Sequence, residues 1–166
     1  MSNNKTMKGL AEAFAGESQA NRKYAIFAAQ AEKEGYKQAA KLFRAASEAE
    51  TIHAADHFRN MGYIKSTREN LQAAIEGETH EFESMYPEFI GWAKEEGQAA
   101  ALRGFELASA AEAVHAGLYK KALANLDKEV VQDIYMCKVC GNIAEGELPV
   151  ECSICKAKSM AFKKID

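Results

Sequence analysis

Two four-residue motifs, Glu50-x-x-His53 and Glu112-x-x-His115, carry the side chains of this chain that are best suited to bind metal together. Residues three apart on a helix share a face, so each motif presents a carboxylate and an imidazole to one point. Two such motifs, with one further Glu from each of two other helices, form the ligand set of di-iron and di-manganese helical bundles. The motifs therefore predict a di-metal site, provided that the chain supplies the other helices and carboxylates.

The helices that would position these motifs are indicated by the spacing of apolar residues. Apolar side chains recur at alternating intervals of three and four, which predicts helices over 5–34, 36–60, 67–96 and 98–126. Gly35, Gly62 and Gly97 separate them, and Ser66 is a candidate N-cap. We expect the third helix to be interrupted at Gly77 and Pro87.

The apolar face of each predicted helix turns polar near its middle. The residues concerned are Glu17, Glu50, His53, Glu78, Glu81, Glu112 and His115. Burying unpaired carboxylates costs several kcal/mol each, and no Lys or Arg lies at this level to neutralise them. Two divalent cations would do so, and oxygen and imidazole ligands without thiolate suit iron, manganese or zinc. His57 and His80 are not needed for this site and are predicted to be ordinary helical residues.

The helical part of the chain repeats itself. Phe27, Glu34-Gly35, Glu50 and His53 recur 62 positions later, as Phe89, Glu96-Gly97, Glu112 and His115. Upstream the offset is 61, because Glu17 matches Glu78. The second copy therefore has one extra residue between Glu78 and Tyr86, close to Glu81. A single extra residue inside a helix is commonly absorbed as a π-bulge, often at a functional site. We predict such a bulge around Glu81.

The four cysteines form a second candidate metal site. They lie in the last 30 residues as two C-x-x-C motifs, Cys137 with Cys140 and Cys152 with Cys155. Four thiolates in this arrangement bind zinc or one iron tetrahedrally, and the spacing alone does not choose between them. A redox-active di-metal site in the same chain favours iron, with zinc as the alternative.

Length and composition limit the other possibilities. The 166 residues suit a helical domain over 1–130 and a small four-cysteine module over 131–166. A net charge of −3, with basic and acidic residues intermixed, gives no reason to expect nucleic acid or a membrane surface as partner. No apolar run approaches the roughly 20 residues of a membrane span, and no signal-peptide core follows the first residues. We therefore expect a cytoplasmic protein.

With these motifs in this order, the chain resembles the rubrerythrin family over nearly its whole length. The matching segments are Gly16-Glu17-Ser18-Gln19-Ala20, Glu50-x-x-His53, Gly77-Glu78-Thr79-His80-Glu81, Met85-Tyr86-Pro87, Glu112-x-x-His115 and the rubredoxin-like cysteine tail. The resemblance implies an all-α ferritin-like four-helix bundle followed by a small rubredoxin-like metal-binding β/loop domain.

The resemblance also implies an activity. It is that of a non-haem di-iron peroxidase, which reduces hydrogen peroxide to water at an oxo-bridged di-iron site and protects against oxidative stress. Electrons would arrive through an FeS4 centre from rubredoxin or an NAD(P)H-dependent rubredoxin reductase. A di-iron oxygen reductase or ferroxidase shares every ligand and is the alternative. An iron store has no use for the four-cysteine module, and a zinc-ribbon interaction protein leaves the glutamates unexplained.

The resemblance assigns a role to each candidate residue. The bridging ligands are Glu50 and Glu112, the terminal ligands are Glu17 and Glu81 on one iron and Glu78 and His115 on the other, and the tyrosines that hydrogen-bond ligand carboxylates are Tyr24 and Tyr86. His53 is implied as the exchangeable ligand, which replaces Glu81 when the site is reduced. Ferric iron prefers the anionic oxygen, and ferrous iron accepts the neutral nitrogen.

The cysteine tail departs from the family pattern at two positions. Ser153 and Lys156 stand where rubredoxin-like knuckles usually have Pro and Gly. The residue after the second Cys of a knuckle tends to need φ > 0, which costs a residue other than Gly about 1 kcal/mol.

The connection between the second and third predicted helices is short. Residues 63–66 span at most about 14 Å, whereas a return along a single-chain bundle needs roughly 30 Å. Either residues 67–76 form a separate crossing segment that is broken at Gly77, or the two hairpins pair with those of a second chain in a domain-swapped homodimer. A homodimer is also implied by the family.

Overall fold

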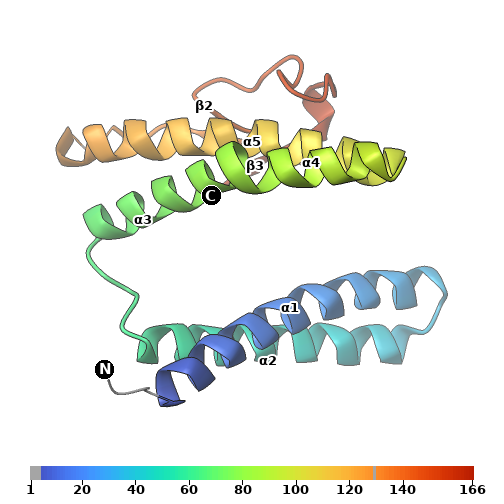
Figure 1. Cartoon of the computed structure of the whole chain (residues 1–166). Helices are drawn as coiled ribbons and strands as arrows, with labels where there is room; N and C mark the ends of the chain where they lie inside the picture. Colours follow the sequence, from blue (N-terminus) through green and yellow to red (C-terminus); the bar gives the residue numbers. More distant parts are fainter. Residues whose placement is uncertain (1–4, 129) are drawn as a thin grey trace. The chain divides into compact units, whose positions relative to one another are not determined.

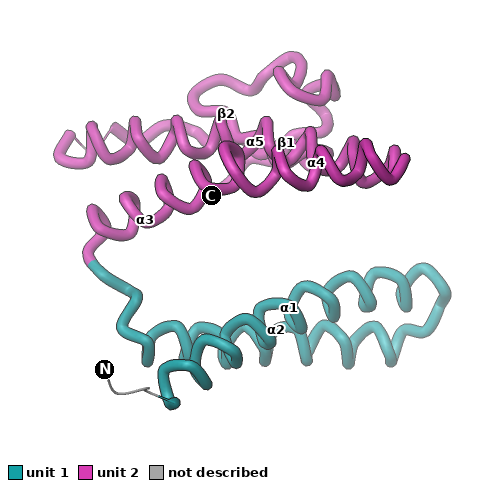
Figure 2. Tube along the Cα trace, viewed as in Figure 1, with its two compact units in different colours: residues 1–65 teal, residues 66–166 magenta. Residues whose placement is uncertain are grey.

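The fold comes from a computed structural model, which describes residues 5–128 and 130–166. The chain forms two compact units, residues 1–65 and residues 66–166 (Figure 2). The first unit is a helical hairpin. The second unit contains another helical hairpin and the four-cysteine module.

The first hairpin consists of α1 (Lys5–Lys33) and α2 (Lys37–Asn60), which pack side by side (Figure 1). The chain reverses at Gly35, whose φ of +87° favours a residue without a Cβ. The buried residues between the helices are small, among them Ala28, Ala40 and Ala54. Small side chains allow the two helices to approach closely over the length that carries Glu17 and the Glu50 motif.

The second hairpin packs α3 (Thr67–His80), η1 (Glu81–Met85) and α4 (Tyr86–Glu95) against α5 (Ala99–Ala124). Ser66 caps α3 in a reciprocal capping box with Glu69, as its position in the sequence indicates. The element η1 is a π-helix. The π-bulge predicted around Glu81 from the change of repeat offset is therefore confirmed.

The predicted interruption of the third helix at Gly77 is wrong, whereas next to Pro87 the π-helix η1 ends and a new α-helix starts at Tyr86. The α-helix α3 passes through Gly77 without a break, and Pro87 lies in the first turn of α4. Gly costs a helix interior only about 1 kcal/mol relative to Ala, which packing can offset. Pro near the start of a helical segment removes an N–H that has no α-helical partner there. Residues 67–76 consequently do not form a separate crossing segment that ends at Gly77.

The four-cysteine module contains a three-stranded antiparallel sheet of β1 (Ile134–Cys137), β2 (Ile143–Glu145) and β3 (Phe162–Ile165), in the order β2-β1-β3. Two short 3₁₀ helices, η2 (Leu126–Lys128) and η3 (Ser159–Ala161), lie in the connections. The core of the module is formed by Cys137, Cys152 and Phe162. The module contacts α5 through β2, and Lys121 of α5 forms an ion pair with Glu145.

None of the helices in the described part of the chain is both long and apolar enough to cross a membrane.

Candidate metal centres

The second hairpin brings Glu78, Glu112 and His115 together. One potential ligand atom from each lies within 4.8 Å of the others, with Glu78 on α3 and the Glu112 motif on α5. The Nδ1 atom of His115 is 2.7 Å from Oε2 of Glu112 and 3.6 Å from Oε2 of Glu78. The i, i+3 spacing of the motif thus produces the shared face that the sequence predicts. We call these three residues the second cluster.

Glu78 in this cluster has an unsatisfied oxygen. Its Oε2 atom is buried, and no hydrogen-bond partner for it exists in the described part of the chain. Burial, a hydrogen bond with Glu112 and the negative charge of Glu112 raise the pKa of Glu78 to about 7. A buried carboxylate with a free oxygen beside a second carboxylate and an imidazole fits a divalent cation, which would satisfy the oxygen and neutralise the charge.

His115 is oriented from its other side by the four-cysteine module. Its Nε2 atom is 3.0 Å from the carbonyl oxygen of Gly141, so Nε2–H donates to the backbone and Nδ1 is left toward the carboxylates. Metal-binding histidines usually donate their second N–H to a carbonyl or carboxylate in this way. The module also covers the ring, and the His115 side chain is 15% exposed.

The first hairpin brings Glu17, Glu50 and His53 together in the same manner. One potential ligand atom from each again lies within 4.8 Å of the others, and Nδ1 of His53 is 2.8 Å from Oε2 of Glu50. The His53 side chain is 55% exposed, because no described element of the first unit covers it as the four-cysteine module covers His115. We call these three residues the first cluster. Each cluster alone offers fewer ligands than a di-metal site needs.

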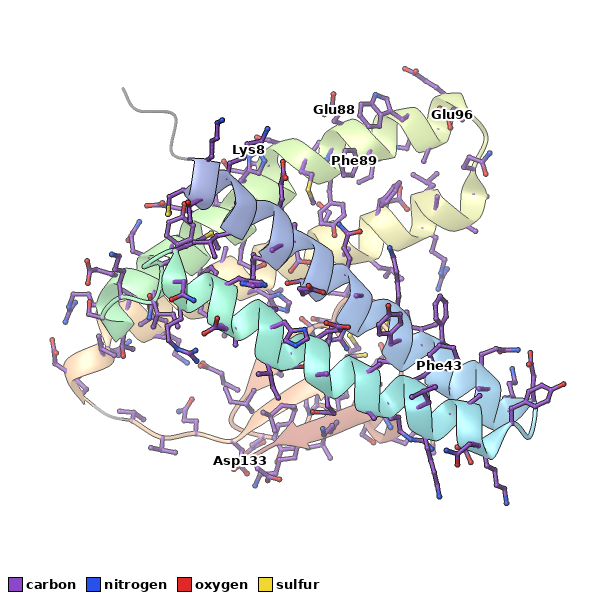
Figure 3. The ribbon with its side chains drawn as sticks, turned by 90° about the horizontal axis from the view of Figure 1, so that it is seen from below. Lys8, Phe43, Glu88, Phe89, Glu96 and Asp133 are labelled. Atoms are coloured by element: carbon purple, nitrogen blue, oxygen red, sulfur yellow. The ribbon has the colours of Figure 1, made fainter. Side chains whose placement is uncertain are left out.

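The seventh predicted ligand, Glu81, begins the π-helix η1 and is not among the close ligand atoms of the second cluster. It is nevertheless near the site, because its charge helps to raise the pKa values of Glu78 and Tyr86. For Tyr86, burial is the largest cause of the raised pKa, followed by the charge of Glu112. Tyr24, its counterpart in the first hairpin, packs against Phe27 and Phe43 (Phe43 is labelled in Figure 3).

The four cysteines converge on one point with their sulfur atoms unbonded. The Sγ atoms of Cys137 and Cys155 are 3.6 Å apart, as are those of Cys140 and Cys152. A disulfide would bring two sulfurs to about 2.05 Å. A tetrahedral centre with metal–sulfur bonds of about 2.3 Å has sulfur–sulfur edges of about 3.8 Å. The spacing therefore fits a single tetrahedral metal ion.

Backbone amides already favour one thiolate in this centre. Burial alone would raise the pKa of Cys152, but N–H donation from Cys155 and Ile154 lowers it to about 7. Burial raises the pKa of Cys140 to about 12 although the Asn142 N–H donates to its sulfur. A bound cation would stabilise all four thiolates and displace the remaining protons.

The two cysteine knuckles share one backbone shape. The residue after the second Cys has φ of +80° at Gly141 and +63° at Lys156, so the expected left-handed position occurs in both. Lys156 is the one residue other than Gly with positive φ among the described residues. Its Nζ donates to the Ser153 carbonyl at 3.0 Å, which partly offsets the strain. The substitution of Ser and Lys for Pro and Gly thus leaves the knuckle intact.

Comparisons with known proteins agree with these two kinds of centre. The family model described as rubrerythrin matches residues 8–123. Nigerythrin of Nitratidesulfovibrio vulgaris is 37% identical over 164 residues, which cover 90% of this chain and 81% of that protein. The chain belongs to the rubrerythrin family.

Other relatives extend the similarity to the whole chain. A rubrerythrin of Porphyromonas gingivalis is 36% identical over 178 aligned positions, covering 96% of this chain and 89% of that protein. The solved structure of nigerythrin in a partially reduced state matches with a TM-score of 0.61 and 33% identity, over 99% of this chain and 91% of that one. The predicted fold class is confirmed. Rubrerythrins are di-iron oxidoreductases with roles in oxidative stress, and the clusters described above supply the Glu/His and four-cysteine ligands of such a protein.

Two features of these rubrerythrin centres were not predicted from the sequence. The first is the Gly141 carbonyl that orients His115, a backbone group 26 residues away in the chain. The second is Asn21, whose amide joins α1 to α2 beside the first cluster. Asn21 lies one turn after Glu17 on the same face, and this spacing was the only sequence signal that could have drawn attention to it.

Proposed function

We propose that this protein is a non-haem di-iron peroxidase, which reduces hydrogen peroxide to water with electrons delivered through iron in the four-cysteine module. Each turnover takes up one peroxide, two electrons and two protons and yields two waters. An NAD(P)H-dependent reductase, acting directly or through rubredoxin, is the proposed source of the electrons.

One observation carries this proposal: a single peptide group links the four-cysteine centre to the second cluster. The carbonyl of Gly141 accepts from Nε2 of His115, and the N–H of the same peptide, which belongs to Asn142, donates to the Cys140 sulfur. A hydrogen-bonded route of one peptide therefore runs from a thiolate to the imidazole of the helical site. A metal store or a zinc-ribbon scaffold has no use for such a connection.

The proposed ligand set combines both clusters. In it, Glu50 and Glu112 would bridge two irons, Glu17 and Glu81 would bind one iron, and Glu78 and His115 would bind the other. Two features of the described residues support unequal roles for the histidines. The Gly141 carbonyl orients His115 at Nε2 and the side chain is 15% exposed, which suits a permanent ligand, whereas the His53 side chain is 55% exposed, which suits exchange with Glu81.

Two bound irons would supply together the two electrons needed to cleave the O–O bond. The side chains provide the rest. The carboxylates would hold the two cations close together, and the raised pKa of Glu78, about 7, lets this carboxyl carry a proton near neutral pH in the metal-free protein. Tyr86 lies among the carboxylates and is kept protonated by burial and by their charge, so its hydroxyl can donate a hydrogen bond to a ligand oxygen.

We further propose that the working form is a domain-swapped homodimer. A bundle formed by one chain would need residues 67–76 to cross back along the bundle and to end at Gly77. The helix α3 is instead continuous from Thr67 to His80. Between the end of α2 at Asn60 and the cap at Ser66 the chain is too short to return along a helix of this length. Pairing of the first hairpin with the second hairpin of another copy removes this conflict.

Stopped-flow oxidation of the anaerobically reduced, iron-loaded protein tests the activity. Equal concentrations of hydrogen peroxide and O₂ are mixed with the protein in separate experiments, and the visible absorption of the thiolate-bound iron reports its oxidation. We expect peroxide to react faster than O₂ and to be reduced to water without release of hydroxyl radical. A faster reaction with O₂ would contradict this function and would indicate an oxygen reductase or a ferroxidase instead.

A further inference from the structure

A network of polar side chains joins the two helices of the first hairpin. The Nδ2 atom of Asn21 on α1 donates to the Ser47 carbonyl at 2.7 Å and to the Thr51 hydroxyl at 2.7 Å, both on α2, and lies 3.2 Å from the Ser47 hydroxyl. The Ser47 hydroxyl donates in return to the Asn21 carbonyl at 2.9 Å. The reverse orientation of the amide would set its oxygen against the Ser47 carbonyl, so the donor assignment follows from the acceptors around it.

This network fixes the register of α1 against α2. A slip of one helix by a single residue moves it about 1.5 Å along its axis, which would break hydrogen bonds of this length. Ser47 is 8% exposed, so its hydroxyl would be left without a partner in a largely apolar contact. The register is therefore set by hydrogen bonds as well as by the packing of alanines.

The network lies beside the first cluster. Asn21 is one turn beyond Glu17 on α1, and Thr51 directly follows Glu50 on α2. The separation of the two carboxylates consequently depends on the same register that the Asn21 amide holds.

The second hairpin lacks this arrangement. At the repeat offset of 62 residues Ser47 becomes Ser109, but Thr51 becomes Ala113, which has no hydroxyl to accept. The helix that faces α5 at this level contains the extra residue of η1. The first hairpin has the Asn21 hydrogen-bond network at this level. The second has instead a π-helix, which displaces Glu81 from the regular α-helical positions.

We propose that Asn21 is a positioning residue for the helical metal centre: its amide holds Glu17 and Glu50 at a fixed separation, so that ligand movement is confined to the second hairpin and His53. This inference rests on the proposed metal site. It adds a named group that sets the geometry of one half of that site without touching the metal.

Conservative variants of Thr51 test the proposal with little risk to folding. Thr51→Val removes the accepting hydroxyl, whereas Thr51→Ser keeps it, and Asn21→Ala removes the donor. The protein is loaded with ferrous iron, and the affinity of the helical site is measured by competition with a chelator. The visible absorption of the oxidised thiolate-bound iron serves as an internal reference. We expect Thr51→Val and Asn21→Ala to weaken the helical site by about tenfold, the lower end of the effect of removing a group that bonds a ligand directly, with Thr51→Ser close to wild type.

A matched control separates positioning from general stability. Arg44→Ala removes a different polar contact between the same two helices, an exposed ion pair to Glu32 at 3.0 Å, and should leave iron affinity unchanged. Equal loss of affinity in Arg44→Ala and Asn21→Ala, or a lowered Tm in Asn21→Ala with unchanged affinity, would overturn the proposal. Failure of the wild-type helical site to bind iron would instead overturn the proposed function on which it rests.

Discussion

The two helical hairpins share a plan that can be compared position by position. In the first, Tyr24, Phe27 and Phe43 have ring centroids 6.4, 6.3 and 5.6 Å apart. In the second, the equivalent rings of Tyr86, Phe89 and Phe105 are 6.3, 6.2 and 5.7 Å apart. The spacing of these three rings is therefore nearly the same in both hairpins, although the ring planes of Tyr24 and Phe27 meet at 45° and those of Tyr86 and Phe89 at 87°. The differences that bear on metal binding lie around the two clusters.

Three local changes make the hairpins unequal. The second has an extra residue, absorbed in η1, and its histidine is covered by the four-cysteine module. The first has the Asn21 network and an exposed histidine. A duplicated scaffold can thus supply two half-sites with different local properties, because a single inserted residue changes the backbone around one cluster.

A large difference is expected between substitutions of the two histidines. His115→Ala should slow electron delivery from the thiolate-bound iron to the helical site by about 10- to 100-fold, because it removes both a proposed ligand and the hydrogen bond to Gly141. His53→Ala should slow it less than about tenfold, since His53 has no such link. Rapid-mixing measurements of the two iron centres after addition of peroxide check this. Equal effects of the two substitutions would mean that the hairpins are not functionally distinct.

Removing the extra residue should make the second hairpin resemble the first. Deletion of Glu83 is expected to convert η1 to regular α-helix, with unchanged helical circular dichroism and about tenfold or greater loss of peroxidase activity through displacement of Glu81. Glu83→Ala, which keeps the chain length, is the control and should retain activity. An active deletion variant would show that the bulge has no functional role.

The metal-free protein should show a pH dependence that comes from the second cluster. The pKa of Glu78 is about 7 in the folded protein, above its ordinary value of 4.5, so the folded state binds this proton more tightly than the unfolded state. This contribution to stability is fully present below about pH 4.5 and is lost as pH rises through 7. Chemical denaturation from pH 5 to 8 should detect it, and Glu78→Gln should abolish this component. A wild type and a variant with parallel pH profiles would contradict the assignment.

The smallest expected effect compares the two knuckles. Lys156→Gly should stabilise the four-cysteine module by about 1 kcal/mol or less, because it relieves a positive φ but loses the bond to Ser153. Gly141→Ala should destabilise it by about 1 kcal/mol for the opposite reason. Thermal unfolding of the metal-loaded protein measures both. Changes of the same sign would show that backbone strain does not govern these positions.

Much of this asymmetry was predictable from residue spacing. The Glu-x-x-His motifs, the paired cysteines and the change of repeat offset each depend on local periodicity, which determines the face on which a side chain lies. The π-helix at Glu81–Met85 followed from counting alone. The break at Gly77 was wrongly predicted, because a glycine's intrinsic helix penalty is small enough for tertiary contacts to override.

The contacts between distant segments were not predictable in this way. The hydrogen bond from His115 to the Gly141 carbonyl depends on how the four-cysteine module packs on α5. Every residue has a backbone carbonyl, so the sequence does not indicate which one will accept this hydrogen bond. The Asn21 network likewise depends on the register of two helices. Asn, Ser and Thr are common in helices, so their presence predicts a hydrogen bond between two helices only when the facing residues are known.

Complementation between two inactive variants tests most directly whether each hairpin is half of a centre shared between chains. Glu50→Ala disables the first hairpin and Glu112→Ala the second, and each alone should lose peroxidase activity by at least about 100-fold. When the two are co-expressed and purified through separate tags, a swapped heterodimer regains one intact site. The mixed dimer should then show about half the wild-type activity per dimer. High activity of either variant alone, or no recovery in the mixed dimer, would contradict a centre shared between chains.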